Sequence, residues 1–203
     1  MTVSAVILAA GRSSRFEDGH KLLAEIDGIP IVRRVCQALA ASDVADIVLV
    51  TSEANGTVAT TAGPGRWRVA ENPDARDGLS TSLRTGLKSI SQDADGLLVA
   101  LADMPAISTE LVNALVSAFR SNPAAIVFPV ASDGRRGHPI LWPKSLFPEL
   151  MTVTGDSGGR AILTSHQALW RPVPCDDEGA FADIDTRADL EAFKARDQAM
   201  RRK

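Results

Sequence analysis

The chain contains only two cysteines among its 203 residues, and Cys36 and Cys175 form neither a CxxC pair nor a zinc-binding spacing. A disulfide framework is therefore excluded, and a reducing compartment, the cytoplasm, is expected. Long apolar runs are also missing: the longest, at residues 5–10 and 97–102, have about six residues, whereas a membrane span needs about 20. The start of the chain lacks the basic flank of a signal peptide. These absences predict a protein without a membrane partner.

A basic excess is missing as well, since 22 lysines and arginines stand against 25 aspartates and glutamates, for a net charge of -3. Proteins that bind duplex DNA usually carry a basic excess, so nucleic acid is not an expected partner. Glycine and proline, at 15 and 11 residues, are too few for a low-complexity chain. The hydrophobic fraction of 45% is ordinary for a globular protein. Length and composition together predict a single domain over residues 1–203.

Short apolar segments alternate with longer helical segments along the chain. We expect strands at residues 3–9, 46–51, 67–70, 97–102, 125–130 and 139–142. We expect helices at residues 30–41 and 80–90, after the cap Ser108, and from Thr186, which forms a capping box with Asp189. This alternation predicts an α/β fold with a mostly parallel sheet. Ligands bind such sheets beyond the carboxyl ends of the strands, which directs attention to the loops at residues 10–20, 71–79, 103–107 and 183–185.

The loop after the first predicted strand is small and basic. It contains neither GxxxxGK[ST] nor GxGxxG, so a P-loop ATPase and a dinucleotide-binding fingerprint are both unsupported. The small residues 9–11 allow the backbone to approach a ligand, and the N–H groups of such a turn cradle phosphate oxygens. Arg12, Arg15 and Lys21 add three cations, and Ser13 adds a hydroxyl. A solvated basic loop is the alternative, but the position directly after a buried strand favours a triphosphate site.

Acidic residues follow later elements of the predicted fold. Asp103 ends the predicted strand at residues 97–102, where an unpaired carboxylate costs free energy. A Mg²⁺ ion, with phosphate oxygens as further ligands, would compensate that cost. Asp183 and Asp185 share one face if their segment is extended, so one of them is a candidate ligand and the other a helix cap. A turn-forming Asp103 and purely capping roles for the other two are the alternatives.

Three further loops are polar. Residues 72–82 lead into a helix whose first turn is rich in hydroxyls, and a helix N-terminus presents N–H groups to an anion or a base. A simple serine cap is the alternative there. Residues 133–139 and 155–160 are rich in glycine and arginine, so they are candidates for binding a second, anionic substrate. Surface hairpins are the alternative for these two loops.

Six segments, in this order along the chain, resemble the MobA-like nucleotidyltransferases, and the molybdenum cofactor cytidylyltransferases most closely. They are LAAGRSSRF with HKLL (8–23), NPDARDGLSTSLRTGL (72–87), ADMP (102–105), GRRGHP (134–139), GDSGGR (155–160) and DIDTRADL (183–190). The resemblance implies a Rossmann-like, GT-A-type fold with three α/β/α layers. It implies transfer of CMP from CTP to a phosphorylated acceptor, the molybdenum–molybdopterin cofactor, with release of pyrophosphate. Mg²⁺, or alternatively Mn²⁺, is the implied cofactor, and a receiving molybdoenzyme is an implied further partner.

The same resemblance implies roles for individual residues. The implied nucleotide-binding residues are Leu8, Ala9, Ala10, Gly11, Arg12, Ser13, Asn72, Asp77, Gly78 and Ser82. The implied catalytic residues are Arg15, Lys21 and Asp103, and the implied metal ligands are Asp103 and Asp185. The implied acceptor-binding residues are Arg136, Gly137, His138, Pro139, Asp156, Gly158 and Arg160. In this scheme Lys21 stabilises charge on the α-phosphate and Arg15 stabilises charge on the leaving pyrophosphate.

One residue bears on the choice of base. Ala10 favours the cytidylyl branch, because guanylyl enzymes usually carry LAGG at this place. The loop departs from the family pattern LAAGxSxRMGxxK, since the stretch from Arg15 to Lys21 is one residue longer and Phe16-Glu17 replaces Met-Gly.

Three other functions stay open. Two are a guanylyltransferase for the same cofactor and a cytidylyltransferase for another phosphorylated acceptor. The third is a non-enzymatic cofactor chaperone for a molybdoenzyme. Arg15, Lys21 and Asp103 argue against the chaperone, because a carrier needs no cation that faces an α-phosphate.

Overall fold

The computed structural model describes residues 1–17, 19–157 and 159–201. Its main element is a seven-stranded sheet with the order β5-β4-β1-β6-β8-β7-β9. The strands are β1 (Val3–Leu8), β4 (Asp46–Thr51), β5 (Arg68–Glu71), β6 (Gly96–Leu101), β7 (Ile126–Val130), β8 (Ile140–Pro143) and β9 (Trp170–Pro174). Strand β8 runs antiparallel to β6 and β7, and all other neighbours are parallel. The predicted, mostly parallel sheet is therefore confirmed.

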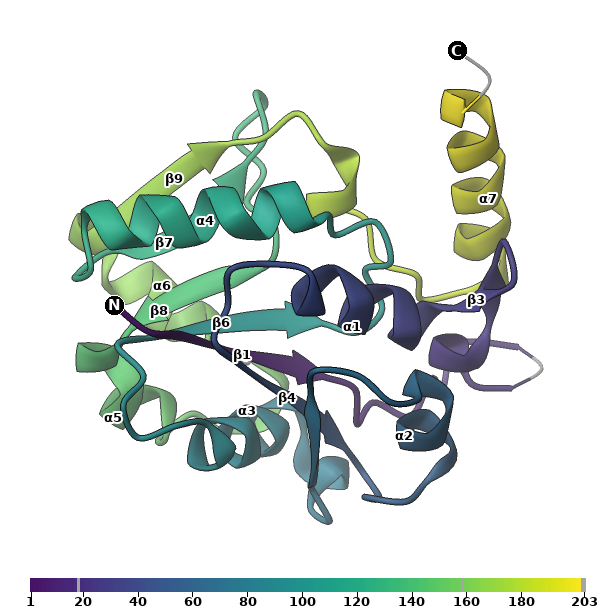
Figure 1. Cartoon of the computed structure of the whole chain (residues 1–203), viewed down its shortest axis with the longest axis horizontal. Helices are drawn as coiled ribbons and strands as arrows, with labels where there is room; N and C mark the ends of the chain where they lie inside the picture. The colour runs from purple at the N-terminus through teal and green to yellow at the C-terminus, as the bar shows by residue number, and fades with distance from the viewer. Residues whose placement is uncertain (18, 158, 202–203) are drawn as a thin grey trace.

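Helices cover both faces of this sheet (Figure 1). They are α1 (Ile31–Ala40), α2 (Thr57–Ala62), α3 (Leu79–Ser89), α4 (Thr109–Ser121), α5 (Phe147–Leu150), α6 (Arg160–Ser165) and α7 (Arg187–Arg201). Successive β1 side chains point to opposite faces, so Ala5 and Ile7 join the core beneath α1 and α4, whereas Val6 and Leu8 join the core beneath α3, α5 and α6. This arrangement is the predicted three-layer α/β/α architecture.

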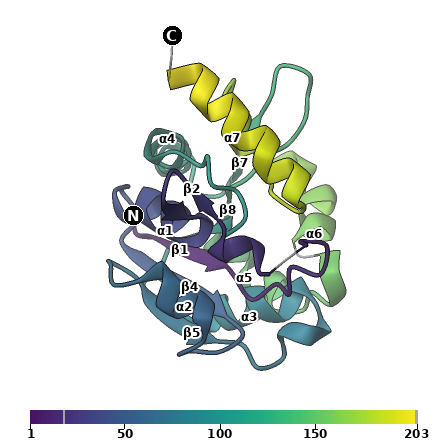
Figure 2. The same cartoon turned by 90° about the vertical axis from the view of Figure 1, so that its right-hand side faces the viewer.

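Smaller elements complete the chain. A two-stranded ribbon, β2 (Glu25–Ile26) and β3 (Ile29–Pro30), precedes α1. The short 3₁₀ turns are η1 (Lys21–Leu23), η2 (Ala75–Asp77), η3 (Lys144–Leu146), η4 (Gly155–Ser157), η5 (Gln167–Leu169) and η6 (Glu178–Ala180). Helix α7 projects away from the layered body (Figures 1 and 2), and its buried Leu190 and Phe193 attach it to the core. No helix in the described part of the chain is long and apolar enough to cross a membrane.

Strand register brings the informative loops to one edge of the sheet. Leu8, the last residue of β1, lies opposite Val50 of β4 and Leu101 of β6. The loops that follow β1 and β6 therefore start side by side. A backbone hydrogen bond of 2.9 Å from Ile184 N to Asp103 O then fastens the segment before α7 to the loop after β6. Three stretches that are distant in sequence thus meet at one place.

Most predicted elements are present, with boundaries shifted by one or two residues. The Ser108 cap is confirmed, because its Oγ accepts a hydrogen bond from Leu111 N. The capping box is confirmed too, since Thr186 N donates to Asp189 Oδ2 and Asp189 N donates to Thr186 Oγ1.

Several short or atypical elements were not anticipated: β9, α2, α5, α6 and the β2–β3 ribbon. Strand β9 contains Pro172 and Pro174 and has no completely buried residue. Proline is tolerated in a strand at the edge of a sheet, so the tertiary position of β9 permits what its local sequence disfavours.

Candidate active site

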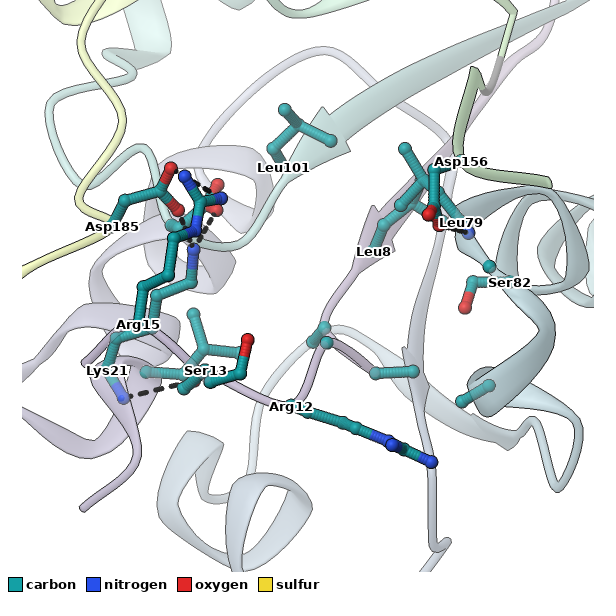
Figure 3. A pocket seen from close by; sticks show the side chains of 18 of the residues that line it. Leu8, Arg12, Ser13, Arg15, Lys21, Leu79, Ser82, Leu101, Asp156 and Asp185 are labelled. Atoms are coloured by element: carbon teal, nitrogen blue, oxygen red, sulfur yellow. Dashed lines mark hydrogen bonds and ion pairs between the residues drawn. The ribbon is translucent and has the colours of Figure 1, made fainter. Parts of the chain in front are cut away.

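A cavity of about 420 Å³ opens at the carboxyl ends of β1 and β6 (Figure 3). Among the residues expected at a functional site, it is lined by Leu8, Ala9, Ala10, Gly11, Arg12, Ser13, Arg15, Lys21, Gly78, Ser82, Asp103, Asp156 and Asp185. Figure 3 shows the charged groups Arg15, Lys21 and Asp185 on one side of this space, with Ser82 and the start of α3 on the other. We call this space the first cavity. Residues from five separate segments of the chain therefore line one cavity.

Lys21 lies at the centre of the charged side. Its Nζ donates to Asp103 Oδ2 at 2.6 Å and to Asp185 Oδ1 at 2.7 Å. Arg15 adds a salt bridge of 2.9 Å from Nη2 to Asp185 Oδ2. The Lys21 side chain is only 12% exposed, whereas that of Arg15 is 72% exposed. Burial by itself lowers the pKa of Lys21, but the charges and hydrogen bonds of the two carboxylates outweigh it and raise the pKa above its usual value.

Asp103, Asp183 and Asp185 form an acidic cluster. Each offers a carboxylate oxygen, and these oxygens lie within 4.8 Å of one another. Asp103 Oδ1 is buried and has no hydrogen-bond partner among the described residues. Carboxylate oxygens are the ligands that hard divalent cations such as Mg²⁺ and Mn²⁺ take in proteins. The donor set and the unpartnered oxygen therefore fit a divalent cation. The capping of α7 falls to Thr186 and Asp189, which leaves Asp183 and Asp185 available as ligands.

His20 fixes the shape of the loop after β1. Its Nδ1 accepts a hydrogen bond from Leu22 N, so Nε2 carries the proton and donates to Gly11 O at 3.0 Å. Ser13 Oγ accepts from Lys21 N and lies 3.2 Å from His20 Nδ1. Burial, together with the charge of Lys21, lowers the pKa of His20, which agrees with a neutral ring. The ring thus ties both ends of the loop together.

The side chain of Asn72 positions the first turn of α3 through hydrogen bonds. This side chain is buried, and its Nδ2 donates to Thr81 Oγ1 and Ser82 Oγ, both at 2.9 Å. Neither Asn72 nor Asp77 lines the first cavity, although both were expected to contact the nucleotide. Asn72 instead positions Ser82, which does line it. Gly78 has φ +106°, and a Cβ there would lie 2.7 Å from Gly155 C.

A second cavity of about 530 Å³ adjoins the first. Of the expected acceptor-binding residues, it is lined by Arg136, Gly137, His138, Asp156 and Arg160. Pro139 is buried and does not line it, and Gly158 lies outside the described residues. Leu8, Leu79, Leu101 and Asp156 line both cavities. The two spaces therefore share a wall.

The second cavity combines aromatic and cationic groups. Trp142 and Phe181 line it, and the Arg136 guanidinium carbon lies 4.9 Å from the ring centroid of Trp170. His138 is nearly enclosed, and burial lowers its pKa although the backbone of Val99 and the charges of Asp103 and Asp183 oppose this shift. This wall suits a flat ring that carries negative charge.

Comparison with known proteins identifies the fold and the family. The sequence pattern of the MobA-like NTP transferase domain matches residues 5–169. The chain belongs to this family. It is a nucleotidyltransferase of the MobA-like type, as the resemblance of its six segments predicted.

Proteins similar to this chain in sequence or structure carry different names. The nicotine blue oxidoreductase of Paenarthrobacter nicotinovorans is 29% identical, over 91% of this chain and 92% of the relative. A molybdenum cofactor guanylyltransferase of Cupriavidus metallidurans is 31% identical, over 97% of each chain. The crystal structure of Rv0371c from Mycobacterium tuberculosis covers 96% of this chain and 98% of its own, with a TM-score of 0.82 and 21% identity. A manganese complex of Rv0371c has also been solved.

Two residues of this MobA-like chain contribute to the site although their sequence context assigned them no role. His20 belongs to the HKLL segment but was given no role of its own, and it organises the loop after β1 through its contacts with Gly11 and Ser13. Arg76 lines the first cavity, and neither Arg76 nor Arg12 forms a salt bridge with the described acidic residues. A signal for Arg76 was present in the sequence, because it is a cationic residue between Asn72 and Gly78, two residues already expected at the nucleotide site.

Proposed function

We propose that this protein transfers a nucleoside monophosphate, CMP from CTP, to the phosphate of a pterin acceptor such as the molybdenum cofactor, and releases pyrophosphate. The observation that carries the proposal is the position of Lys21 and Arg15 with the carboxylates Asp103 and Asp185 in the first cavity. This cavity lies directly beside the second cavity, which is lined by cationic side chains. The first cavity takes the triphosphate, and the second takes the acceptor. The wall that the two cavities share at Asp156 supports an arrangement in which the two substrates bind side by side.

The reaction needs mainly positioning and charge stabilisation. An oxygen of the ionised acceptor phosphate attacks the α-phosphorus of the nucleotide, and a new P–O–P linkage forms. The bond from the α-phosphorus to the oxygen that leads to the β-phosphate breaks, and pyrophosphate leaves with that electron pair. Lys21 stabilises the α-phosphate, and Arg15 stabilises the leaving group. No general base is required, because the acceptor phosphate is already ionised.

Asp103 and Asp185, with Asp183 as a third carboxylate, would hold Mg²⁺. Bound Mg²⁺ supplies neutralising charge to phosphate oxygens. The manganese complex of Rv0371c, a protein of the same fold, supports a divalent cation in general.

The acceptor is proposed from the second cavity. A flat heterocycle packs against the partly exposed Phe181, and Arg136 and Arg160 offer charge-assisted hydrogen bonds to its phosphate. The relative named molybdenum cofactor guanylyltransferase supports a pterin acceptor. That relative also makes GTP the second candidate nucleotide. Ala10, which lines the first cavity, is the residue that favours CTP.

Pyrophosphate release tests the proposal. The protein is incubated with Mg²⁺, the pterin cofactor and each of the four ribonucleoside triphosphates in turn. We expect release that depends on both the cofactor and CTP. Cofactor-dependent release with GTP, and with none of the other three nucleotides, would establish the guanylyl alternative. No release with any nucleotide would refute nucleotidyl transfer to this acceptor.

A matched pair of variants assigns the chemistry to the site. Lys21→Ala is expected to lower turnover by orders of magnitude with the fold intact. Lys88→Ala, an exposed residue in the last turn of α3, removes the same charge far from the catalytic residues and is expected to leave turnover unchanged. Equal turnover in the two variants would refute the role of Lys21.

A further inference from the structure

We propose that Lys21 is a built-in counter-ion that occupies the cation position of the acidic cluster until nucleotide phosphates draw it away, so that nucleotide and divalent cation bind cooperatively. This inference rests on the proposed nucleotidyl transfer and concerns the regulation of the same site. Lys21 Nζ lies 2.6 Å from Asp103 Oδ2 and 2.7 Å from Asp185 Oδ1. These carboxylates are also the ligands available to a divalent cation.

The ammonium group and a metal ion cannot both use these oxygens. A divalent ion binds carboxylate oxygens at about 2.0–2.6 Å, which would bring it against the ammonium hydrogens of Lys21. Two adjacent positive charges in a half-buried site repel each other strongly. The Lys21 side chain is only 12% exposed, so water screens this repulsion poorly. Entry of the ion therefore requires Lys21 to leave.

The acidic cluster cannot stay without a counter-ion at neutral pH. Asp103 and Asp185 are only 20% and 24% exposed, and Asp183 stands within reach of both. Three carboxylates so close together repel one another unless a cation lies among them. Lys21 supplies that cation, and Arg15 contributes from the outer side of Asp185. The buried Asp103 Oδ1, which has no partner among the described residues, is the oxygen that the ammonium leaves unsatisfied.

The first cavity offers Lys21 a second position. Lys21 lines this cavity together with the loop at residues 8–15, where the triphosphate is proposed to bind. A lysine carries its charge on a flexible four-carbon stem, so the ammonium can turn from the carboxylates to a phosphate without a change in the backbone. The carboxylates then become free for the divalent ion. By reciprocity, each ligand strengthens the binding of the other.

The test uses Mn²⁺ alone, without nucleotide or acceptor, and follows the loss of the free-ion electron paramagnetic resonance signal on titration. Lys21→Met removes the ammonium and keeps a side chain of similar length. We expect Lys21→Met to bind Mn²⁺ at least about tenfold more tightly than the unaltered protein, which corresponds to about 1.4 kcal/mol. Lys88→Met, which removes an exposed charge from α3 and leaves η1 and the acidic cluster unchanged, is expected to match the unaltered protein. Lys21→Arg keeps the charge and is expected to bind Mn²⁺ as weakly as the unaltered protein.

Thermal unfolding gives a second readout on the same variants. Without metal, Lys21→Met leaves the three carboxylates without the buried ammonium and with Arg15 only on the outer side of Asp185, so its Tm should be below that of the unaltered protein. Mn²⁺ should then raise the Tm of Lys21→Met more than that of the unaltered protein, because a ligand stabilises the folded state according to its affinity.

The inference would be overturned if Lys21→Met and the unaltered protein bound Mn²⁺ equally, or if Lys21→Arg bound it as tightly as Lys21→Met. A Lys21→Met variant that stayed unfolded in excess Mn²⁺ would overturn it as well, because the freed carboxylates would have failed to take up the ion. None of these measurements involves catalysis. A failure of the proposed nucleotidyl transfer is seen separately, as absence of pyrophosphate release.

Discussion

Asn72→Ala is the substitution that best connects the fold of this protein to its site. Asn72 is 1% exposed and makes three side-chain hydrogen bonds: Nδ2 donates to Thr81 and Ser82, and Oδ1 accepts from Asp74 N. A buried hydrogen bond contributes about 1 kcal/mol to stability. Loss of all three is therefore expected to lower the free energy of unfolding by about 3 kcal/mol.

The assay is thermal and urea-induced unfolding, followed by nucleotide kinetics. In a chain of this length, 1 kcal/mol shifts Tm by about 2–4 °C, so we expect Asn72→Ala to melt about 6–12 °C below the unaltered protein. Asn55→Ala removes an exposed asparagine from a turn and is the matched control, with Tm unchanged. We also expect a higher nucleotide KM with a smaller change in kcat, because Asn72 positions Ser82, whereas Lys21 and Asp103 come from other elements.

Two results would refute this reasoning. A loss of stability below about 1 kcal/mol would mean that the three hydrogen bonds are replaced by water at little cost. An unchanged KM in a clearly destabilised variant would mean that Ser82 does not contribute to nucleotide binding.

Three further expectations can be tested on the same protein. Gly78→Ala should lower stability by about 1–3 kcal/mol in urea unfolding, because φ at Gly78 is +106° and the new Cβ would lie 2.7 Å from Gly155 C; an unchanged urea midpoint would contradict this. Burial raises the pKa of the Cys36 thiol to about 12, so mass spectrometry after native alkylation should find Cys175 modified before Cys36, and equal rates would refute the argument. Burial lowers the pKa of His138 below its ordinary value of 6.5. As the pH falls, His138 is therefore protonated in the unfolded chain before it is protonated in the folded protein. The contribution of the neutral His138 to the free energy of unfolding should be fully present above pH 6.5 and be lost as the pH falls through the folded-state pKa. Urea unfolding of His138→Gln between about pH 7.5 and 5 should show a smaller loss than the unaltered protein, and equal losses would exclude His138 as the cause.

The secondary structure near the site was accessible from sequence because its signals are local. An apolar run interrupted only by Ser4 predicted the completely buried β1. Ser108 and the pair Thr186 and Asp189 predicted where two helices begin, because a cap acts within three residues of the helix start. Strand β9 was missed because its stability comes from parallel pairing with β7 and not from its own residues, two of which are prolines.

The site could be predicted as a set of loops but not as an arrangement of side chains. Parallel strands place the loops that follow them at one edge of a sheet, and this rule located most of the residues that line the first cavity. The same rule does not say which way a side chain points. Asn72 was expected in the cavity wall but turns inward to Thr81 and Ser82.

The sequence by itself therefore determined the order of the main strands and helices, the basic loop at residues 9–21 and the acidic residues Asp103 and Asp185, because these depend on near neighbours and on motif spacing. The tertiary structure alone decided that Lys21 pairs with both carboxylates, which lie 82 and 164 residues away along the chain. It also decided that the two cavities share a wall at Asp156. Such contacts depend on strand register and on the packing of whole elements, and no short stretch of sequence encodes them.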